Sequence, residues 1–342
     1  MRTDVVIDGA GLTGIACARI LAERGRNVLI LERRNYIGGN CFDSVLNGVM
    51  VHNYGPHCFR TNNADVWEFA NRFSIFNDFI HRVQARLDNG LIIPIPFNLK
   101  SQEIISEYWR KMGVRISFDE KHIKEMIMHT YSEKQWGMSY DKIPARITAR
   151  VPLCRQDYED RYCVTNYAGI PMRGYTEWLC NMKNHPLINV ALKCGTVDWE
   201  SIRKHNKLLI YTGKIDEFFN YCYGRLPYRS LNFVHSTALK RIIPIINECN
   251  RTVDYTRSYD HSHFLNQDGP QTIITQEYPC AHDTMNIPFY PIPTDENLAL
   301  YSKYKELADK EKGVMFIGRL AEYSYMDMDV AILNVINKLG DI

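Results

Sequence analysis

The stretch Val5-Val6-Ile7-Asp8-Gly9-Ala10-Gly11-Leu12-Thr13-Gly14 opens the chain, and Val28-Leu29-Ile30-Leu31-Glu32 follows it after a short helical pattern. Together they predict a strand, a glycine turn, a helix and a second strand. Gly9 would allow the tight turn, Gly11 would let the backbone approach a pyrophosphate, and Gly14 would pack the helix against the sheet. The helix N-terminus would then face the phosphate charge.

Glu32 lies 18 residues after Gly14. A carboxylate at this distance accepts a hydrogen bond from a ribose hydroxyl and repels a 2′-phosphate. The stretch therefore predicts a dinucleotide site that favours FAD or NAD over NADP. An ordinary glycine turn is the alternative.

Composition narrows the class of protein. The net charge of +2, from 41 basic and 39 acidic residues in 342, is too small to create a positive electrostatic field that attracts a polyanion, so no nucleic-acid partner is expected. The ten cysteines show no C-x-x-C pair and no zinc-ligand spacing, so we expect no metal site and a reducing compartment. Four residues precede the first strand and no apolar run is long enough to span a membrane, so we expect a cytoplasmic protein without membrane association.

Two later apolar segments indicate strands that return to the first sheet. Residues 205–213 end at Thr212-Gly213 and residues 314–319 end at Gly318-Arg319, with a glycine at the edge where doubly wound folds bind ligands. Residues 76–98 alternate in polarity around a turn and predict an antiparallel hairpin. Residues 101–149 have a helical pattern, and residues 228–293 suit an antiparallel sheet that covers the cofactor.

Several motifs occur in one order along the chain. They are Gly55-Pro56-His57, Lys134-Gln135-Trp136-Gly137, Tyr255-Thr256-Arg257, Phe289-Tyr290-Pro291, and Gly318-Arg319-Leu320 through Tyr325-Met326-Asp327-Met328-Asp329. With the glycine turn, this set resembles the UDP-galactopyranose mutase family, and the resemblance runs from the first strand to the last helix.

The resemblance implies an α/β fold: a Rossmann-like FAD-binding domain with a parallel sheet, a small inserted helical domain and an antiparallel β-sheet domain. The expected boundaries are 1–75, 185–230 and 310–342 for the FAD-binding domain, 99–149 for the helical insert with a mobile loop, and 76–98, 150–184 and 231–309 for the antiparallel sheet domain. The insert contributes to dimer contacts in bacterial members, so a homodimer is also implied.

The resemblance further implies an FAD-dependent isomerase, an intramolecular transferase that interconverts a UDP-hexopyranose and a UDP-hexofuranose. The sugar would be galactose or N-acetylgalactosamine, and the furanose would be a donor for surface polysaccharide. Reduced flavin is the active form in this family, and the reaction passes through an adduct of its N5 with the sugar. The protein must hold the sugar and stabilise the departing diphosphate, a task that suits arginine.

Residue roles follow from the family motifs, position by position. The catalytic set is His57, Arg150, Arg257, Arg319, Tyr290, Tyr325 and Asp327. The cofactor set is Gly9, Gly11, Leu12, Thr13, Gly14, Glu32, Arg33, Gly39, Asn40, His57, Thr212, Gly213, Arg229, Gly318, Arg319, Met326, Asp327 and Met328. The substrate set is Arg60, Tyr131, Trp136, Arg150, Tyr162, Asn247, Arg257, Glu277, Tyr290 and Tyr325.

Two departures from the family pattern bear on specificity. Arg60 stands where the typical mutase loop has histidine, and its guanidinium could bind a different sugar substituent, such as an acetamido carbonyl. Ile127 stands where an aromatic residue usually packs on the uracil, and the helical insert is short. A dTDP- or GDP-sugar substrate therefore stays open, as do a flavin oxidoreductase of the amine-oxidase type and a flavoprotein that only binds a nucleotide sugar.

Overall fold

The structure is a computed structural model that describes residues 3–149, 154–195, 198–205, 208–283 and 285–340. Within these residues, five strands form a parallel sheet in the order β16-β10-β1-β2-β9. Its strands are β1 (Val5–Asp8), β2 (Val28–Leu31), β9 (Ile188–Ala191), β10 (Leu208–Tyr211) and β16 (Val314–Phe316). Their aliphatic runs are typical of strands with both faces covered. The predicted return of two later segments to the first sheet is confirmed.

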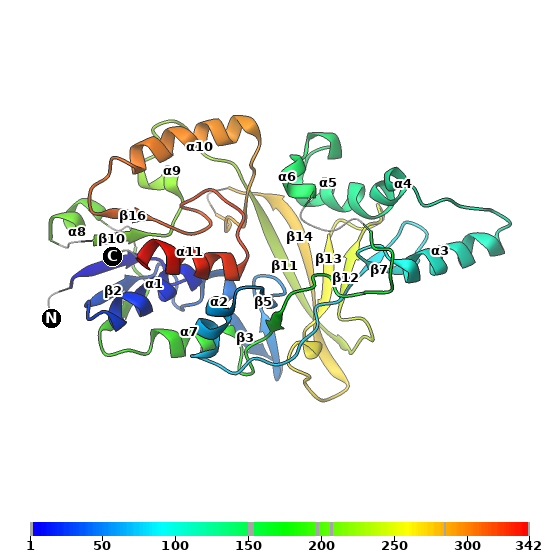
Figure 1. Ribbon diagram of the computed structural model, residues 1–342, viewed down its shortest axis with the longest axis horizontal. Helices are drawn as coiled ribbons and strands as arrows, with labels where there is room; N and C mark the ends of the chain where they lie inside the picture. The colour runs from blue at the N-terminus through cyan, green and yellow to red at the C-terminus, as the bar shows by residue number, and fades with distance from the viewer. Residues whose placement is uncertain (1–2, 150–153, 196–197, 206–207, 284, 341–342) are drawn as a thin grey trace.

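Helices cover both faces of this sheet (Figure 1). α1 (Leu12–Glu23) packs against α7 (Tyr175–Lys183) and α11 (Met328–Gly340) on one face. On the other face, Trp199 of α8 (Trp199–His205) packs against Tyr211 and Phe218. The chain forms this α/β layer from segments far apart in sequence, because β9, β10 and β16 all come after residue 185.

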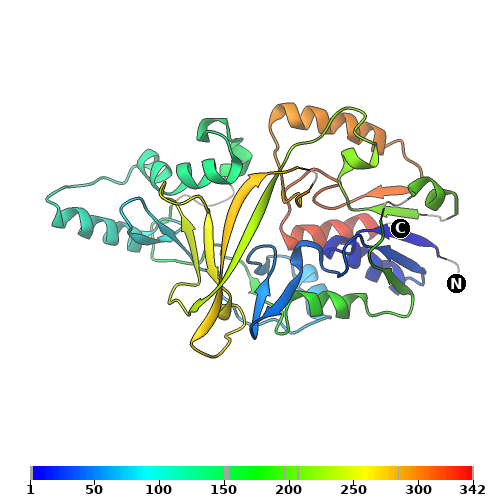
Figure 2. The same cartoon turned by 180° about the vertical axis from the view of Figure 1, so that it is seen from behind.

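A second, mostly antiparallel sheet stands beside the first layer (Figure 2). In the described chain it has seven strands in the order β15-β11-β14-β13-β12-β6-β7. They are β6 (Val83–Arg86), β7 (Ile92–Ile95), β11 (Tyr228–Leu239), β12 (Ile245–Glu248), β13 (Arg257–Asp260), β14 (Gln271–Ala281) and β15 (Tyr290–Pro291). β6 and β7 form the predicted hairpin, whereas β12 and β6 pair in parallel.

The helical insert extends away from the rest of the molecule beyond this sheet (Figure 1). It contains α3 (Leu99–Lys111), α4 (Glu120–Lys124), the π-helix η2 (Glu125–His129), α5 (Thr130–Trp136), η3 (Tyr140–Lys142) and α6 (Ala145–Thr148). α3 begins at Asn98, whose side chain forms a capping box with Ser101. α5 ends at Gly137 in the left-handed conformation, with φ of 66°. The expected helical segment is confirmed.

The remaining elements connect these layers. They are η1 (Gly39–Cys41), β3 (Asp43–Leu46), β4 (Val49–His52), β5 (Phe59–Thr61), α2 (Ala64–Asn71), β8 (Tyr167–Gly169), α9 (Ile215–Phe218), η4 (His261–His263) and α10 (Asp295–Ala308).

One segment lies elsewhere than predicted. Residues 150–184 were expected in the antiparallel sheet domain, but β8 pairs with β5, and α7 packs on α1. The indole of Trp178 in α7 also donates to the carbonyl of Ala70. Residues 167–183 therefore pack with the first layer, because the buried face of α7 fits α1 and α2 rather than the second sheet.

Two negative findings apply to the described residues. No helix in this part of the chain is long and apolar enough to cross a membrane. No group of three or more His, Cys, Asp or Glu side chains in the same residues could hold a metal ion.

Candidate active site

A first cavity lies at the carboxyl edge of the parallel sheet and has a volume of about 520 Å³. All the predicted cofactor residues except His57 and Arg229 line it. They come from the β1–α1 turn, the end of β2, the Gly38–Asn40 segment, the end of β10 and the segment that leads into α11. The folded chain therefore gathers at one edge a set of residues that the sequence spreads over more than 300 positions.

The glycine turn fits a dinucleotide pyrophosphate. A Cβ atom at Gly14 would lie 2.0 Å from the carbonyl oxygen of Gly9, and one at Gly39 would lie 2.9 Å from the Cα of Gly11. Gly11 is the N-cap of α1 and contributes no side-chain hydrogen bond, so the first N–H groups of this helix remain available to an anion. The backbone segments at Gly11 and Gly39 therefore lie closer together than a side chain would allow. The positive N-terminal end of α1 faces the cavity beside them.

Glu32 provides the acidic group of the first cavity. Its side chain is 5% exposed and accepts hydrogen bonds from the backbone N–H groups of Ala10 at 2.9 Å and Arg34 at 2.8 Å. These bonds fix the carboxylate beside the glycine turn, where its remaining lone pairs can accept from a ribose diol. The residues present therefore fit FAD.

A second cavity, of about 300 Å³, lies between the antiparallel sheet and the helical insert. Every described member of the predicted substrate set lines it, from Arg60 to Tyr325. Asn40, Arg319, Asp327 and Met328 line both cavities, so the two spaces meet at these residues. A ligand in the second cavity can therefore contact a cofactor bound in the first.

Arg257 is the centre of one polar group in the second cavity. Its guanidinium donates to Asn247 Oδ1 at 3.0 Å and to the Tyr131 hydroxyl at 2.9 Å. Glu277 Oε2 lies 3.9 Å from Arg257 Nη1. Burial raises the pKa of Glu277, and the positive charge of Arg257 opposes this shift. These partners come from α5, β12 and β14, so the side chain of Arg257 links the insert to the sheet.

Arg60 and Asp327 form a second polar group. Arg60 Nη2 donates to Asp327 Oδ2 at 2.9 Å, across a sequence separation of 267 residues. Both side chains stay partly exposed to the cavity, at 23% and 34%. A guanidinium carries five N–H groups, more than the bond to Asp327 uses, so the pair can bind a polar ligand.

Stacked tyrosines form the wall where the cavities meet. The rings of Tyr290 and Tyr325 lie 5.5 Å apart and nearly parallel, at 8°. The Arg319 guanidinium lies 5.2 Å from the Tyr325 centroid and donates to the carbonyls of Phe289 and Met326. Trp136 of α5 lies 6.1 Å from Tyr290. The aromatic wall holds Arg319 in place beside both spaces.

His57 also lines the second cavity, from the turn between β4 and β5. Burial and the nearby Arg319 guanidinium lower the pKa of this imidazole to about 4. It is therefore neutral at physiological pH. The turn packs tightly against the sheet, because a Cβ atom on Gly55 would lie 3.3 Å from Glu277 Oε1.

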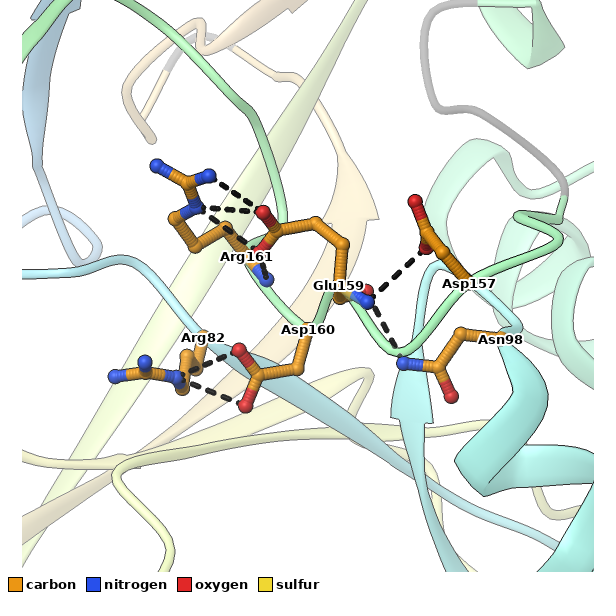
Figure 3. A network of polar contacts seen from close by, with 6 residues as sticks. All are labelled: Arg82, Asn98, Asp157, Glu159, Asp160 and Arg161. Atoms are coloured by element: carbon orange, nitrogen blue, oxygen red, sulfur yellow. Dashed lines mark hydrogen bonds and ion pairs between the residues drawn. The ribbon is translucent and has the colours of Figure 1, made fainter.

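The segment before Tyr162 is fastened by the polar network in Figure 3. Asp160 accepts from Arg82 at 2.8 Å, and the Asn98 side chain donates to the Glu159 carbonyl at 3.1 Å. Arg161 bonds back to Glu159 within the same segment. These contacts tie residues 157–161 to Arg82, which directly precedes β6, and to the N-cap of α3, and so place the Tyr162 ring at the cavity.

His81 lines the second cavity although it was absent from the predicted set. Its ring lies 5.1 Å from that of Tyr162, and its Nδ1 atom is buried without a hydrogen-bond partner in the described chain. Burial, with Arg60 and Arg257 nearby, lowers the pKa of this histidine to about 3. A histidine before a strand has no distinguishing sequence pattern, so only the fold reveals it.

Two predicted residues stand apart from the others. Arg150 lies outside the described residues. Arg229, expected at the cofactor, lines neither cavity and instead donates to the backbone carbonyls of Gln135 at 2.9 Å and Lys134 at 3.3 Å. Its guanidinium caps the C-terminus of α5, where cations interact favourably with the helix dipole. Arg229 lies near the start of β11, where its side chain reaches the C-terminal carbonyls of α5.

Comparisons with known proteins agree with this architecture. The family model for UDP-galactopyranose mutase matches residues 126–325, and that for the NAD(P)-binding Rossmann-like domain matches residues 7–73. A probable UDP-galactopyranose mutase of Klebsiella pneumoniae is 35% identical over 96% of this chain and 92% of its own length. A dTDP-fucopyranose mutase of Escherichia coli is 32% identical, over 97% and 96% of the two chains.

A solved structure of reduced UDP-galactopyranose mutase has the same fold. It superposes with a TM-score of 0.76 at 16% identity and covers 99% of this chain and 96% of its own. The family model matches more than half of the chain, and the sequence similarity spans nearly all of it. The chain therefore belongs to the UDP-galactopyranose mutase family.

Proposed function

We propose that the protein interconverts the pyranose and furanose forms of a UDP-linked hexose, with FAD as its cofactor. The observation that supports this most directly is the junction of the two cavities at Asn40, Arg319, Asp327 and Met328. One cavity fits a dinucleotide and the other presents arginines and tyrosines. Their junction lets a bound nucleotide sugar contact the cofactor, as a family of FAD-dependent mutases requires.

When FAD is bound and reduced, it would supply the nucleophile that attacks the anomeric carbon, and the sugar would undergo no net oxidation. The chain holds this cofactor by two devices. The N-terminus of α1 and the glycine turn receive the pyrophosphate, and Glu32 receives the adenosine ribose. A carboxylate at that position disfavours a 2′-phosphate, which supports FAD over a phosphorylated dinucleotide.

The diphosphate would bind at Arg257 and Arg319. Among the described lining residues of the second cavity are three guanidinium groups, of Arg60, Arg257 and Arg319, and three carboxyl groups, of Glu277, Asp327 and Asp329. The guanidinium groups of Arg257 and Arg319 would stabilise the negative charge that develops as the diphosphate leaves the sugar. The arginines are already held by neighbours, so little reorganisation accompanies binding.

The hydroxyl groups of Tyr162, Tyr290 and Tyr325 are suited to bind phosphate oxygens beside those arginines. Tyr131 and Trp136 of α5 form the wall on the insert side. Closure by aromatic side chains excludes water from the open-chain sugar and so prevents hydrolysis. These roles agree with the positions that the family motifs predict.

The hexose would lie near Arg60, Asp327 and the neutral imidazole of His57. The Arg60 guanidinium could donate to the carbonyl of an acetamido group at C2, so both UDP-galactose and UDP-N-acetylgalactosamine are proposed substrates. The names of the two relatives support a nucleotide hexose and differ in base and sugar. A furanose product would serve as donor for surface polysaccharide, and a cytoplasmic homodimer is the proposed form.

The test is an anaerobic assay of purified protein with dithionite. UDP-galactose, UDP-N-acetylgalactosamine and dTDP- and GDP-hexoses are supplied separately, and chromatography detects a furanose product. A furanose peak that depends on reduction is expected with at least one UDP-sugar. A peak with only a dTDP- or GDP-hexose would reject the UDP assignment, and bound FAD without any new peak would reject the mutase.

Substitution tests the diphosphate site separately. Arg319→Ala should nearly abolish turnover while FAD stays bound, and Arg150→Ala should do the same if the family motif assigns it correctly. The matched control is Arg173→Ala, because Arg173 is exposed, lines neither cavity and pairs with Glu177 of α7. Normal turnover in Arg319→Ala would remove this residue from the site.

A further inference from the structure

His52, the last residue of β4, makes an unusual contact with the turn that carries His57. Its side chain is 1% exposed. Its Nδ1 atom accepts the backbone N–H of His57, with a nitrogen–nitrogen distance of 3.1 Å. This bond closes the turn between β4 and β5 from the inside of the molecule, on the side away from the cavity.

The chain of contacts continues from His52 into the second sheet. The backbone N–H of His52 donates to His261 Nδ1 at 3.2 Å. His261 Nε2 lies 2.7 Å from Thr275 Oγ1, which lies 2.7 Å from His235 Nδ1. Because His261 accepts at Nδ1, its Nε2 carries the proton and donates to Thr275. The threonine hydroxyl can then donate to His235. The hydrogen bonds from His52 through His261 and Thr275 to His235 therefore all donate in the same direction.

This arrangement fixes the protonation of His52. An imidazole nitrogen that accepts a hydrogen bond carries no proton, so neutral His52 has its proton on Nε2. That Nε2 is buried and has no hydrogen-bond partner in the described chain. The ring stacks on Phe264, with centroids 4.7 Å apart, and lies edge-on to Tyr175. Burial accordingly lowers the pKa of His52 well below 6.5.

An unpartnered buried N–H destabilises the folded state, and an apolar side chain in the same aromatic slot would avoid that cost. Packing against Phe264 and Tyr175 therefore does not account for an imidazole at this position. The atom that an apolar side chain would lack is the Nδ1 acceptor, whose partner is the His57 backbone. The chemistry of His52 thus points to the His57 turn.

The turn needs such support because its backbone is irregular. Gly55 has φ of 106°, and residues 53–58 run between β4 and β5 outside both strands. His57 lines the second cavity, near enough to Arg319 and Asp327, which line both cavities, for their charges to act on its imidazole. A small rotation of the His57 backbone would move its side chain relative to any ligand there.

We propose that His52 is a positioning residue: its unprotonated Nδ1 holds the His57 turn at the wall of the second cavity, and His261 in turn holds His52 from the second sheet. The inference rests on the proposed function for the role of His57. The hydrogen bond itself does not depend on that function.

Three variants separate positioning from packing. In His52→Asn, the side-chain oxygen is bonded to Cγ, as the imidazole Nδ1 is, so the acceptor is kept. In His52→Gln the amide is one bond further out, and in His52→Leu the acceptor is lost. We expect kcat within about threefold of the unaltered enzyme for the asparagine variant, and a roughly 10- to 100-fold loss for the other two, with KM for UDP-galactose changed less than about threefold.

The bound-flavin absorption spectrum gives a second reading that does not need turnover. It should stay unchanged in His52→Asn and shift in His52→Gln and His52→Leu. Circular dichroism confirms that each variant is folded. Full activity and an unchanged spectrum in His52→Leu, or equal loss in folded His52→Asn and His52→Gln, would overturn the proposal.

Nitrogen-15 NMR of the unaltered protein, with labelled histidine, decides the matter if the variants do not fold. We expect His52 with Nδ1 unprotonated and Nε2 protonated at neutral pH; a proton on Nδ1 would overturn the proposal. The furanose assay of the unaltered enzyme tests the function by itself. A failed assay with an unprotonated Nδ1 would therefore count against the function and leave the positioning bond intact.

Discussion

Substitution of Lys134 by methionine should loosen the wall of the second cavity. Lys134 lies in α5 between Tyr131 and Trp136, both of which line that cavity. Its ammonium donates three hydrogen bonds to backbone carbonyls of one loop, to Asn250 and Val253 at 3.1 Å and to Tyr255 at 3.0 Å. Methionine keeps an unbranched apolar stem that ends at the Cε position, and it removes all three bonds.

The size of the effect follows from these contacts. A hydrogen bond from a charged donor contributes about 1.5 to 3 kcal/mol, which would give at least about 4 kcal/mol for three. The ammonium is only half-buried, so solvent screens it, and burial lowers the pKa of Lys134. Both effects reduce the net stabilisation. We therefore expect the free energy of unfolding to fall by about 2 kcal/mol.

Urea denaturation measures this loss, and hydrogen exchange locates it. Amide exchange should speed up in residues 130–137 and 250–256 and stay unchanged in the parallel sheet. KM for the nucleotide sugar should rise, because α5 carries two wall residues. The matched control is Lys124→Met in the same insert, whose ammonium pairs with Glu120 at the exposed surface, and it should change neither stability nor KM.

A fall in unfolding free energy of less than about 0.5 kcal/mol in Lys134→Met, with unchanged exchange in both segments, would refute this reasoning. The three carbonyls would then be satisfied equally well by water, and Lys134 would not dock α5 on the sheet. An equal effect in Lys124→Met would show that loss of charge, rather than loss of the three bonds, is responsible.

Three further predictions concern the cofactor, the sugar and acid. The Gly14→Ala variant should lose most of its FAD on gel filtration, because the new Cβ would lie 2.0 Å from the Gly9 carbonyl oxygen. The control variant Gly340→Ala should keep its FAD, because its new Cβ would meet no atom within 4 Å. Equal FAD retention in the two variants would contradict the tight turn. Arg60→His should change the ratio of kcat/KM between UDP-galactose and UDP-N-acetylgalactosamine by about tenfold, and an unchanged ratio would make Arg60 a bystander. Burial lowers the pKa of His261 from 6.5 to about 3. As the pH drops from 6.5 towards 3, His261 is protonated in the unfolded chain but not in the folded one, so the free energy of unfolding falls. From about pH 7.5 to about pH 4.5, the free energy of unfolding measured with urea should fall by about 3 kcal/mol more in the unaltered protein than in His261→Asn. The same pH dependence in both proteins would count against a neutral buried His261.

Local conformation was readable from the sequence because it depends on residues close together in the chain. The β1–α1 turn needs glycine wherever a Cβ would collide with backbone, and Gly9 has φ of 113°. The hairpin of β6 and β7 and the helical pattern of the insert follow from polarity that alternates or repeats over a few residues. Family motifs then placed Arg60, Arg257 and Tyr290 in one site, although each by itself resembles a surface residue.

Tertiary structure alone decided the contacts that join distant segments. Arg60 meets Asp327 across 267 residues, Arg229 caps α5 instead of lining a cavity, and residues 167–183 pack with the first layer. His81 and His52 likewise gain a role only where the lobes meet. Sequence pattern determined which groups can form a strand, a helix end or a phosphate cradle. Which of them become neighbours depends on how whole buried faces fit together, and that energy is shared by many side chains and is not recorded in any short stretch.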